Sequence, residues 1–420
     1  MSIKTSRQKM APQKKNNPMS ENELLNPQPE QNEDGDPINS GIRSLKDLID
    51  TVTGRNLAGL VDESESGIVD RQPFPFLAIV GQMEMKLALL LNLINPAVGG
   101  VLLLGTRGTG KTTAVRSLAN LTPKVPRSLC YYGCTEQDVE TQGIDAICPN
   151  CAKKYGEGKP LTQMEDVRLV ELPLNAQIED VVGGIDERAA LHQRMRLKRG
   201  ILAQADRNIL YVDEVNLLQD DIVNAILDAA AIGTYTVRRG PVSSTYYARF
   251  SLIGSMNPEE GALRPQIMDR FGLRLLVNGL EETKDRWEVY QRVQQYRQNS
   301  AAMLSSYQEE TQYARQEIQH ARDILPKVAI PEQVANAGLA LIQDLQITSL
   351  RAEITLFEAA RAYAAADNRL EVTMEDLDTV APMALRMRKS DFITEFFEQH
   401  TKEDQRLRDR LKTIVKEQRN

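Results

Sequence analysis

Eight residues, one quarter of the way along this 420-residue chain, restrict its fold more than any other segment. Gly105-Thr-Arg-Gly-Thr-Gly-Lys-Thr112 fits the pattern GxxxxGK[ST] in full. It follows the apolar residues 100–104, which are typical of a buried strand, and precedes an expected helix over 112–121. In that setting the glycines let backbone N–H groups face phosphate oxygens, and the helix N-terminus adds partial positive charge. The pattern predicts a phosphate-binding loop on a parallel α/β sheet.

The loop also predicts which side chains meet a nucleotide. Lys111 should reach the β- and γ-phosphates of ATP, and Thr112 should ligate Mg²⁺. The alternative is a glycine-rich turn with a solvated lysine, which the strand-to-helix context disfavours. The residues expected at the nucleotide are Gly105, Thr106, Arg107, Gly108, Thr109, Gly110, Lys111, Thr112 and Thr113.

An acidic pair, Asp213 and Glu214, can supply the second Mg²⁺ ligand and the general base that a phosphate-binding loop requires. The apolar residues 209–212 predict a buried strand, and Asp213 and Glu214 follow it directly. Ligands of α/β sheets bind at the carboxyl ends of strands, so Asp213 is a candidate second Mg²⁺ ligand. Glu214 is the candidate general base that polarises the attacking water. Strands often end in aspartate, but the combination with the loop makes the assignment specific.

Two further polar positions are candidates for catalysis. Asn257 follows an expected strand over 250–254, where its side chain can orient water beside the γ-phosphate. Arg264 and Arg270 flank a short expected helix over 265–269. An arginine there can reach the γ-phosphate of a neighbouring subunit, or can simply cap a helix at the surface.

The only four cysteines of the chain form two close pairs. Cys130 and Cys134 are spaced CxxxC, Cys148 and Cys151 are spaced CxxC, and thirteen residues separate the pairs. This spacing predicts a structural Zn²⁺ site with four thiolate ligands. A redox-active dithiol and unligated thiols remain as alternatives.

Composition and patterning divide the chain and limit its function. The net charge of −7 argues against nucleic acid as a partner. Without a long apolar segment or a signal core, we expect no membrane insertion and a cytoplasmic location. The expected parts are a mostly disordered extension (1–70), an α/β domain (71–279) with a cysteine insertion (128–156) and a β-hairpin insertion (234–247), an all-α domain (280–390) and a helical tail (391–420).

These motifs, in this order, resemble the AAA+ ATPases and more closely the I subunit of magnesium chelatase. The segments that carry the resemblance are 76–82, 105–112, 171–174, 200–205, 213–218 and 257–272. The resemblance implies an AAA+ P-loop domain with a parallel sheet, followed by an all-α lid domain. It also implies a hexameric ring that hydrolyses ATP.

The resemblance assigns further residues by position. Ile79, Val80, Gly81 and Gln82 would line the adenine side of the site. Asn257 would be sensor 1, Arg270 the arginine finger, and Arg351 the sensor-2 arginine of the lid.

The resemblance also implies partners and a pathway. A D subunit with a von Willebrand A domain and a catalytic H subunit would complete a ligase of chlorophyll biosynthesis that inserts magnesium into protoporphyrin IX. The alternative is a related AAA+ remodelling chaperone that works with a von Willebrand A-domain partner on another metalloprotein.

Overall fold

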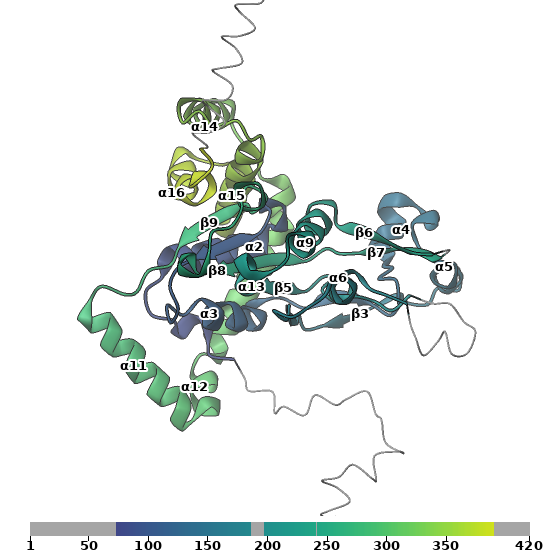
Figure 1. Cartoon of the computed structure of the whole chain (residues 1–420), viewed down its shortest axis with the longest axis horizontal. Coiled ribbons are helices and arrows are strands. Elements are labelled where there is room, and N and C mark those ends of the chain that lie inside the picture. Colours follow the sequence, from purple (N-terminus) through teal and green to yellow (C-terminus); the bar gives the residue numbers. More distant parts are fainter. Residues whose placement is uncertain (1–72, 186–196, 241, 390–420) are drawn as a thin grey trace, which may run out of the picture. The chain divides into compact units, whose positions relative to one another are not determined.

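The computed structural model describes residues 73–185, 197–240 and 242–389, and the chain is shown in Figure 1. The expected extension over 1–70 and the tail over 391–420 lie outside the described residues. The centre of the described part is a five-stranded sheet with the order β4-β5-β8-β1-β9. All four strand pairs are parallel. The strands are β1 (Val101–Leu104), β4 (Leu169–Glu171), β5 (Ile209–Val212), β8 (Ser251–Met256) and β9 (Leu273–Leu276).

Alternation along the strands divides the sheet into two apolar faces. In β1, Val101 and Leu103 join one core cluster, whereas Leu102 and Leu104 join the other. This alternation follows from the twofold side-chain period of a strand, and both faces are buried because helices cover each of them. The α/β fold class predicted from the sequence is therefore confirmed.

The first face is covered by early helices and by the C-terminal helices together. One continuous core cluster contains residues of α2 and α3, of the strands, and of α13 to α16. The helices concerned are α2 (Met83–Ile94), α3 (Lys111–Ser117), α13 (Gln308–Ile324), α14 (Glu332–Asp344), α15 (Arg351–Ala366) and α16 (Met374–Leu385). The lid helices expected as a separate domain after residue 279 thus share their core with the sheet.

The second face is covered by four helices between β4 and β9 in the chain. They are α6 (Ile178–Val182), α8 (Ile201–Gln204), α9 (Asp220–Ile232) and α10 (Pro265–Met268). In chain order, α11 (Thr283–Gln298) and α12 (Ser300–Ser306) follow β9 and precede α13, and Figure 1 shows α11 as a long helix away from α14 to α16. α11 contains no buried residue.

Two small antiparallel sheets stand apart from the main one. The hairpin β6 (Thr234–Arg239) and β7 (Val242–Tyr247) lies where the sequence predicts it. The second pair, β2 (Val125–Ser128) and β3 (Thr162–Glu165), brackets the cysteine insertion with its helices α4 (Glu136–Gln142) and α5 (Pro149–Gly156). The sequence analysis missed β2, β3 and the edge strand β9. Each has only four residues, and β2 contains a proline, so local periodicity is a weak signal there.

Candidate active site

The phosphate-binding loop connects β1 to α3 as the pattern predicts. Gly108 and Gly110 have φ angles of +80° and +86°, which side chains other than glycine rarely adopt. At Gly105 an added Cβ would lie 2.1 Å from the carbonyl oxygen of Val277, so only glycine fits beside β9. Lys111 begins α3, and its ammonium group donates to the carbonyl oxygens of Gly105 (2.6 Å) and Thr106 (2.8 Å). Burial lowers the pKa of Lys111, and the carboxylates opposite it partly offset that effect.

The residues expected to hold Mg²⁺ lie side by side. Thr112 Oγ1 is 3.5 Å from Asp213 Oδ2, although the two residues are 101 positions apart. Two oxygens that bind one Mg²⁺ at about 2.1 Å lie roughly 3 to 4 Å apart, so this pair fits a shared ion. The parallel pairing of β1, β8 and β5 produces this proximity, because it places the carboxyl ends of all three strands at one edge.

Two residues that the sequence analysis missed hold Asp213 in place. The Tyr211 hydroxyl donates to Asp213 Oδ1 (2.9 Å) and lies 3.2 Å from Thr112 Oγ1. Ser255 Oγ from β8 also donates to Asp213 Oδ1. Burial raises the pKa of Tyr211, which keeps its hydroxyl protonated as a donor. Their position in the sequence could have identified them, because Tyr211 lies two residues before Asp213 and Ser255 lies two residues before Asn257.

The candidate base Glu214 has an uncommon backbone conformation and is held by contacts of its backbone and its side chain. Its φ angle of +51° is uncommon for a residue with a side chain, and such conformations concentrate at functional sites. Its backbone N–H donates to Ser255 Oγ at 3.2 Å. Its carboxylate meets Arg107 of the loop at 3.5 Å.

A third carboxylate, also missed from the sequence, completes this side of the site. Glu260 Oε1 lies 2.5 Å from Arg107 Nη2 and accepts a hydrogen bond from Asn257 Nδ2 at 3.1 Å. Asn257 itself is buried, and its Oδ1 accepts from the backbone of Glu259. The loop, the acidic pair and Asn257 therefore converge on one place.

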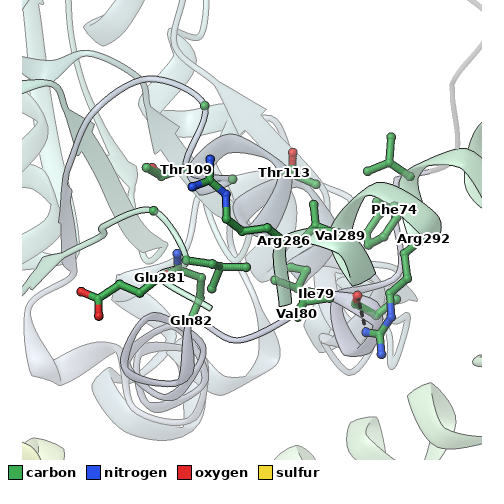
Figure 2. A pocket seen from close by; sticks show the side chains of 16 residues that line it. Phe74, Ile79, Val80, Gln82, Thr109, Thr113, Glu281, Arg286, Val289 and Arg292 are labelled. Carbon is green, nitrogen blue, oxygen red and sulfur yellow. Dashed lines mark hydrogen bonds between the residues drawn. The ribbon is translucent and has the colours of Figure 1, made fainter. Parts of the chain in front are cut away.

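A cavity of about 600 Å³ adjoins the loop, and neither Asp213 nor Glu214 lines it (Figure 2). Ile79, Val80 and Gln82 line it, as do Thr109 and Thr113. Gly81 is not among the lining residues; its φ of +60° and a Leu280 side chain 2.6 Å from an added Cβ explain the glycine. Figure 2 shows that α11 contributes Arg286, Val289 and Arg292 to the same cavity. A largely apolar cavity beside a phosphate loop suits the base of a nucleotide.

The three remaining arginine candidates form ion pairs with aspartates outside the phosphate loop. Arg270 forms an ion pair with Asp228 of α9 at 2.7 Å. Arg264, the other arginine considered, pairs with Asp220 at the start of the same helix. Arg351 pairs with Asp269 at 3.2 Å, and its side chain is 55% exposed. Among the described residues, neither Arg270 nor Arg351 forms a hydrogen bond or ion pair with the phosphate loop.

The four cysteines come together although the sequence separates the pairs. Their sulfur atoms all lie within 4.8 Å of one another, and none of the four forms a disulfide. Hydrogen bonds from neighbouring thiols, Cys134 first, lower the pKa of Cys130 to about 4. Burial raises the pKa of Cys151 to about 12.

Among the described residues, no helix is both long and apolar enough to cross a bilayer. The chain matches the family model of the AAA domain (dynein-related subfamily) over residues 100–271 and that of the AAA lid domain over residues 339–410. It is 42% identical over 323 residues to a magnesium-chelatase subunit ChlI homolog of Methanocaldococcus jannaschii, a match that spans 76% of this chain and 87% of the relative. The chain belongs to the magnesium-chelatase I-subunit family of AAA ATPases.

Other members of the magnesium-chelatase I-subunit family are similar at comparable levels. The magnesium-chelatase subunit ChlI of a Nostoc species is 39% identical, over 76% of this chain and 84% of the relative. A cryo-electron microscopy structure of the complex between subunits BchI and BchD of magnesium chelatase contains a chain with 38% identity and a TM-score of 0.43. That match covers 78% of this chain and 99% of the other. As a member of this family, the chain is an ATPase with ATP and Mg²⁺ as its ligands.

Proposed function

We propose that this chain is the ATP-hydrolysing motor subunit of a magnesium chelatase. It couples ATP turnover to the insertion of magnesium into protoporphyrin IX by partner subunits. The observation that carries the proposal is the 42% identity to a magnesium-chelatase subunit homolog over most of both chains. The assembled loop, acidic pair and Asn257 support the motor half of it.

The proposed hydrolysis uses the residues gathered at the loop. Lys111 and the loop N–H groups bind the phosphates, and Thr112 and Asp213 would hold Mg²⁺, which neutralises phosphate charge when bound. Glu214 accepts a proton from water while the water oxygen bonds to the γ-phosphorus. The bond from that phosphorus to the β–γ bridging oxygen breaks, which releases ADP and phosphate. Asn257 orients the water.

The proposed assembly is a homo-oligomeric ring, with six subunits by analogy to the family. In that ring Arg270 would leave Asp228 and approach the γ-phosphate bound by the next subunit. Arg351 of the lid is the proposed sensor of bound nucleotide in its own subunit. A D-type subunit with a von Willebrand A domain and an H-type subunit are the proposed partners, and the cytoplasm is the proposed location.

The proposed cofactor set includes one structural Zn²⁺ at the four cysteines. The support is their spacing and the closeness of their sulfur atoms. With four thiolates such a site leaves no open coordination position, so it would not take part in hydrolysis.

Reconstitution tests the proposal directly. The purified chain is mixed with candidate D and H subunits, ATP, Mg²⁺ and protoporphyrin IX, and magnesium protoporphyrin is followed by its fluorescence. The proposal expects product that depends on ATP and on Lys111. ATP hydrolysis without any porphyrin product, but with activation of a different metalloprotein by a von Willebrand A-domain partner, would favour the chaperone instead.

A further inference from the structure

The β6–β7 hairpin depends on packing against other parts of the chain for its stability. Among the described residues, β6 and β7 form a separate two-stranded sheet and pair with no other strand. Isolated two-stranded hairpins are marginally stable in water and need a packed face. Here that face consists of Val237 and Tyr246, which are 4% and 1% exposed. What covers these two side chains therefore decides whether the hairpin is ordered.

The loop between the first two cysteines supplies part of that cover, together with Leu197 and Ala203. Cys130-Tyr131-Tyr132-Gly133-Cys134 places two aromatic residues between two sulfur atoms. The ring of Tyr132 stacks on Tyr246, with centroids 5.8 Å apart and planes at 23°. Tyr132 also belongs to the small core around the cysteines, so one side chain connects the two clusters.

Two polar contacts join the same parts. The Tyr247 hydroxyl donates to the carbonyl oxygen of Ala146, between the cysteine pairs, at 3.4 Å. Arg249, two residues after the hairpin, forms an ion pair with Asp138 at 2.7 Å. It also donates to the carbonyl oxygen of Gly133 at 3.4 Å, within the CxxxC loop. The cysteine insertion and the hairpin thus contact each other through the loop that carries the sulfur atoms.

The cysteine insertion is itself too small to be held by its apolar core. Its buried apolar residues are Ile147 and Leu161 with Cys134 and Cys151, so half of them are cysteines. Modules with so little core generally need a disulfide or a metal. The sulfur atoms of Cys130 and Cys148 are 3.5 Å apart, well beyond the roughly 2.05 Å of a disulfide bond.

The sulfur positions suit a tetrahedral metal site. Four sulfurs at about 2.3 Å from one Zn²⁺ lie about 3.8 Å from each other, and all observed pairs fall within 4.8 Å. Backbone N–H groups of Tyr132 and Cys148 point at the sulfurs of Cys130 and Cys134, both at 3.3 Å. Such donors stabilise negative charge on thiolate ligands, as outer hydrogen bonds do at metal sites.

We propose that one Zn²⁺, bound by the thiolates of Cys130, Cys134, Cys148 and Cys151, holds the β6–β7 hairpin in place through Tyr132. The inference rests on the zinc assignment made in the proposed function and adds what that ion does. Zinc fixes the CxxxC loop, and through Tyr132 this loop covers part of the apolar face of the hairpin. Loss of zinc therefore loosens the hairpin while the sheet and the phosphate loop stay folded.

Metal analysis tests the first half. The full chain is purified anaerobically, and we expect about one zinc per chain by mass spectrometry. Growth with Co²⁺ should give the visible absorption of tetrahedral cobalt thiolate, and Cys148→Ser should lose both signals. Iron in place of zinc, or metal-free wild-type protein that keeps the hairpin protected, would overturn the proposal.

Hydrogen–deuterium exchange tests the second half. In Cys148→Ser we expect hairpin amides to exchange at least about tenfold faster, with β5 unchanged as internal reference. Tyr132→Ala should keep its zinc and loosen the hairpin equally. Tyr155→Ala, a tyrosine of the same insertion that is 38% exposed, is the matched control and should change neither.

Two safeguards keep the outcome interpretable. If Cys148→Ser exchanges rapidly everywhere, wild-type protein stripped with a chelator under reducing conditions replaces it. An unchanged hairpin in zinc-free protein overturns the proposal. ATP binding and magnesium insertion are measured on the same samples, so a failed chelatase assay with zinc present contradicts only the proposed function.

Discussion

At the scale of single residues, the adjacent carboxylates of Asp213 and Glu214 differ in their hydrogen-bond partners. Asp213 accepts hydrogen bonds from Tyr211 and Ser255, and its other carboxylate oxygen lies 3.5 Å from Thr112 Oγ1, the proposed partner ligand for Mg²⁺. Within the described part of the chain, the Glu214 carboxylate pairs with Arg107 alone, which is consistent with its proposed role as the base. The division of labour between these adjacent acids leads to two predictions.

Glu214→Gln should retain ATP binding and lower the rate of hydrolysis by about 100-fold or more, because the amide cannot accept the proton from water. Binding is measured with a fluorescent ATP analogue and turnover by phosphate release. Glu259→Gln is the control, since Glu259 is a nearby exposed acid. A variant that hydrolyses ATP at the wild-type rate would disprove the assignment of the base.

Tyr211→Phe should raise the Mg²⁺ concentration needed for half-maximal ATPase activity by about tenfold, while the maximal rate changes little. Loss of a hydrogen bond that orients a metal ligand typically weakens metal binding to that extent. The measurement is an Mg²⁺ titration of steady-state turnover. An unchanged Mg²⁺ dependence would show that Tyr211 only fills space.

At the scale of elements, the first glycine of the phosphate loop is required by packing against the chain that follows β9. β1 enters the loop between β8 and β9, and the loop can turn only because Gly105 passes close to the backbone of Val277. The pattern in the sequence shows a glycine, but the contact that requires it comes from Val277, the residue that follows β9.

Gly105→Ala should lower the free energy of unfolding by at least about 2 kcal/mol, because its Cβ would overlap the carbonyl of Val277. Gly279→Ala is a matched control with open space around the added Cβ, and it should change stability by less than about 1 kcal/mol. Chemical denaturation of both variants measures the difference. Equal stability of the two would contradict the packing argument.

At the scale of the whole molecule, one carboxylate joins the lid to the sheet. Asp269 follows α10 and forms ion pairs with Arg274 of β9, Arg351 of α15 and Arg388 after α16. Arg388 has no exposed side-chain surface and also donates to the carbonyl oxygens of Phe271 and Gly272. Because Asp269 is next to Arg270, the lid and the proposed finger are attached to the same short segment.

Hydrogen bonding from Ser349 and the neighbouring arginines together hold the pKa of Asp269 below its ordinary value despite burial. A lowered pKa in the folded state means that this carboxylate contributes stability above its unfolded pKa, near 3.9. That contribution is lost as the pH falls through the lower, folded value. Asp269→Asn should therefore be less stable than wild type at pH 7, and the difference should shrink below about pH 4. Denaturation at several pH values measures it, and a constant difference would argue against the ion-pair cluster.

Mixing two inactive variants tests the proposed ring. Lys111→Ala should not bind ATP and Arg270→Ala should bind but not hydrolyse it, so each alone should have little activity. If Arg270 acts on the neighbouring subunit, a mixture should recover part of the activity, because an intact finger can then face an intact site. Arg264→Ala, which loses a similar surface ion pair with α9, should stay active. A mixture without activity, when both variants assemble, would exclude action between subunits.

Local patterns were enough to predict the α/β class, the phosphate loop, the strand that ends in Asp213 and the hairpin. Each of these features depends on a contiguous run of residues whose periodicity or spacing favours one local structure.

Other features arise only when distant segments meet. The edge strand β9 is too short to have a periodic signal, and its neighbour β1 defines it. No sequence motif identifies Tyr211, Ser255 or Glu260 as site residues. They contact Asp213 and Asn257 only because of the order of the strands in the sheet. The four cysteines predicted a metal, but their contact with the hairpin through Tyr132 comes from the tertiary structure alone. Residue spacing along a chain determines local geometry, whereas contacts across more than a hundred positions depend on how the sheet orders its strands.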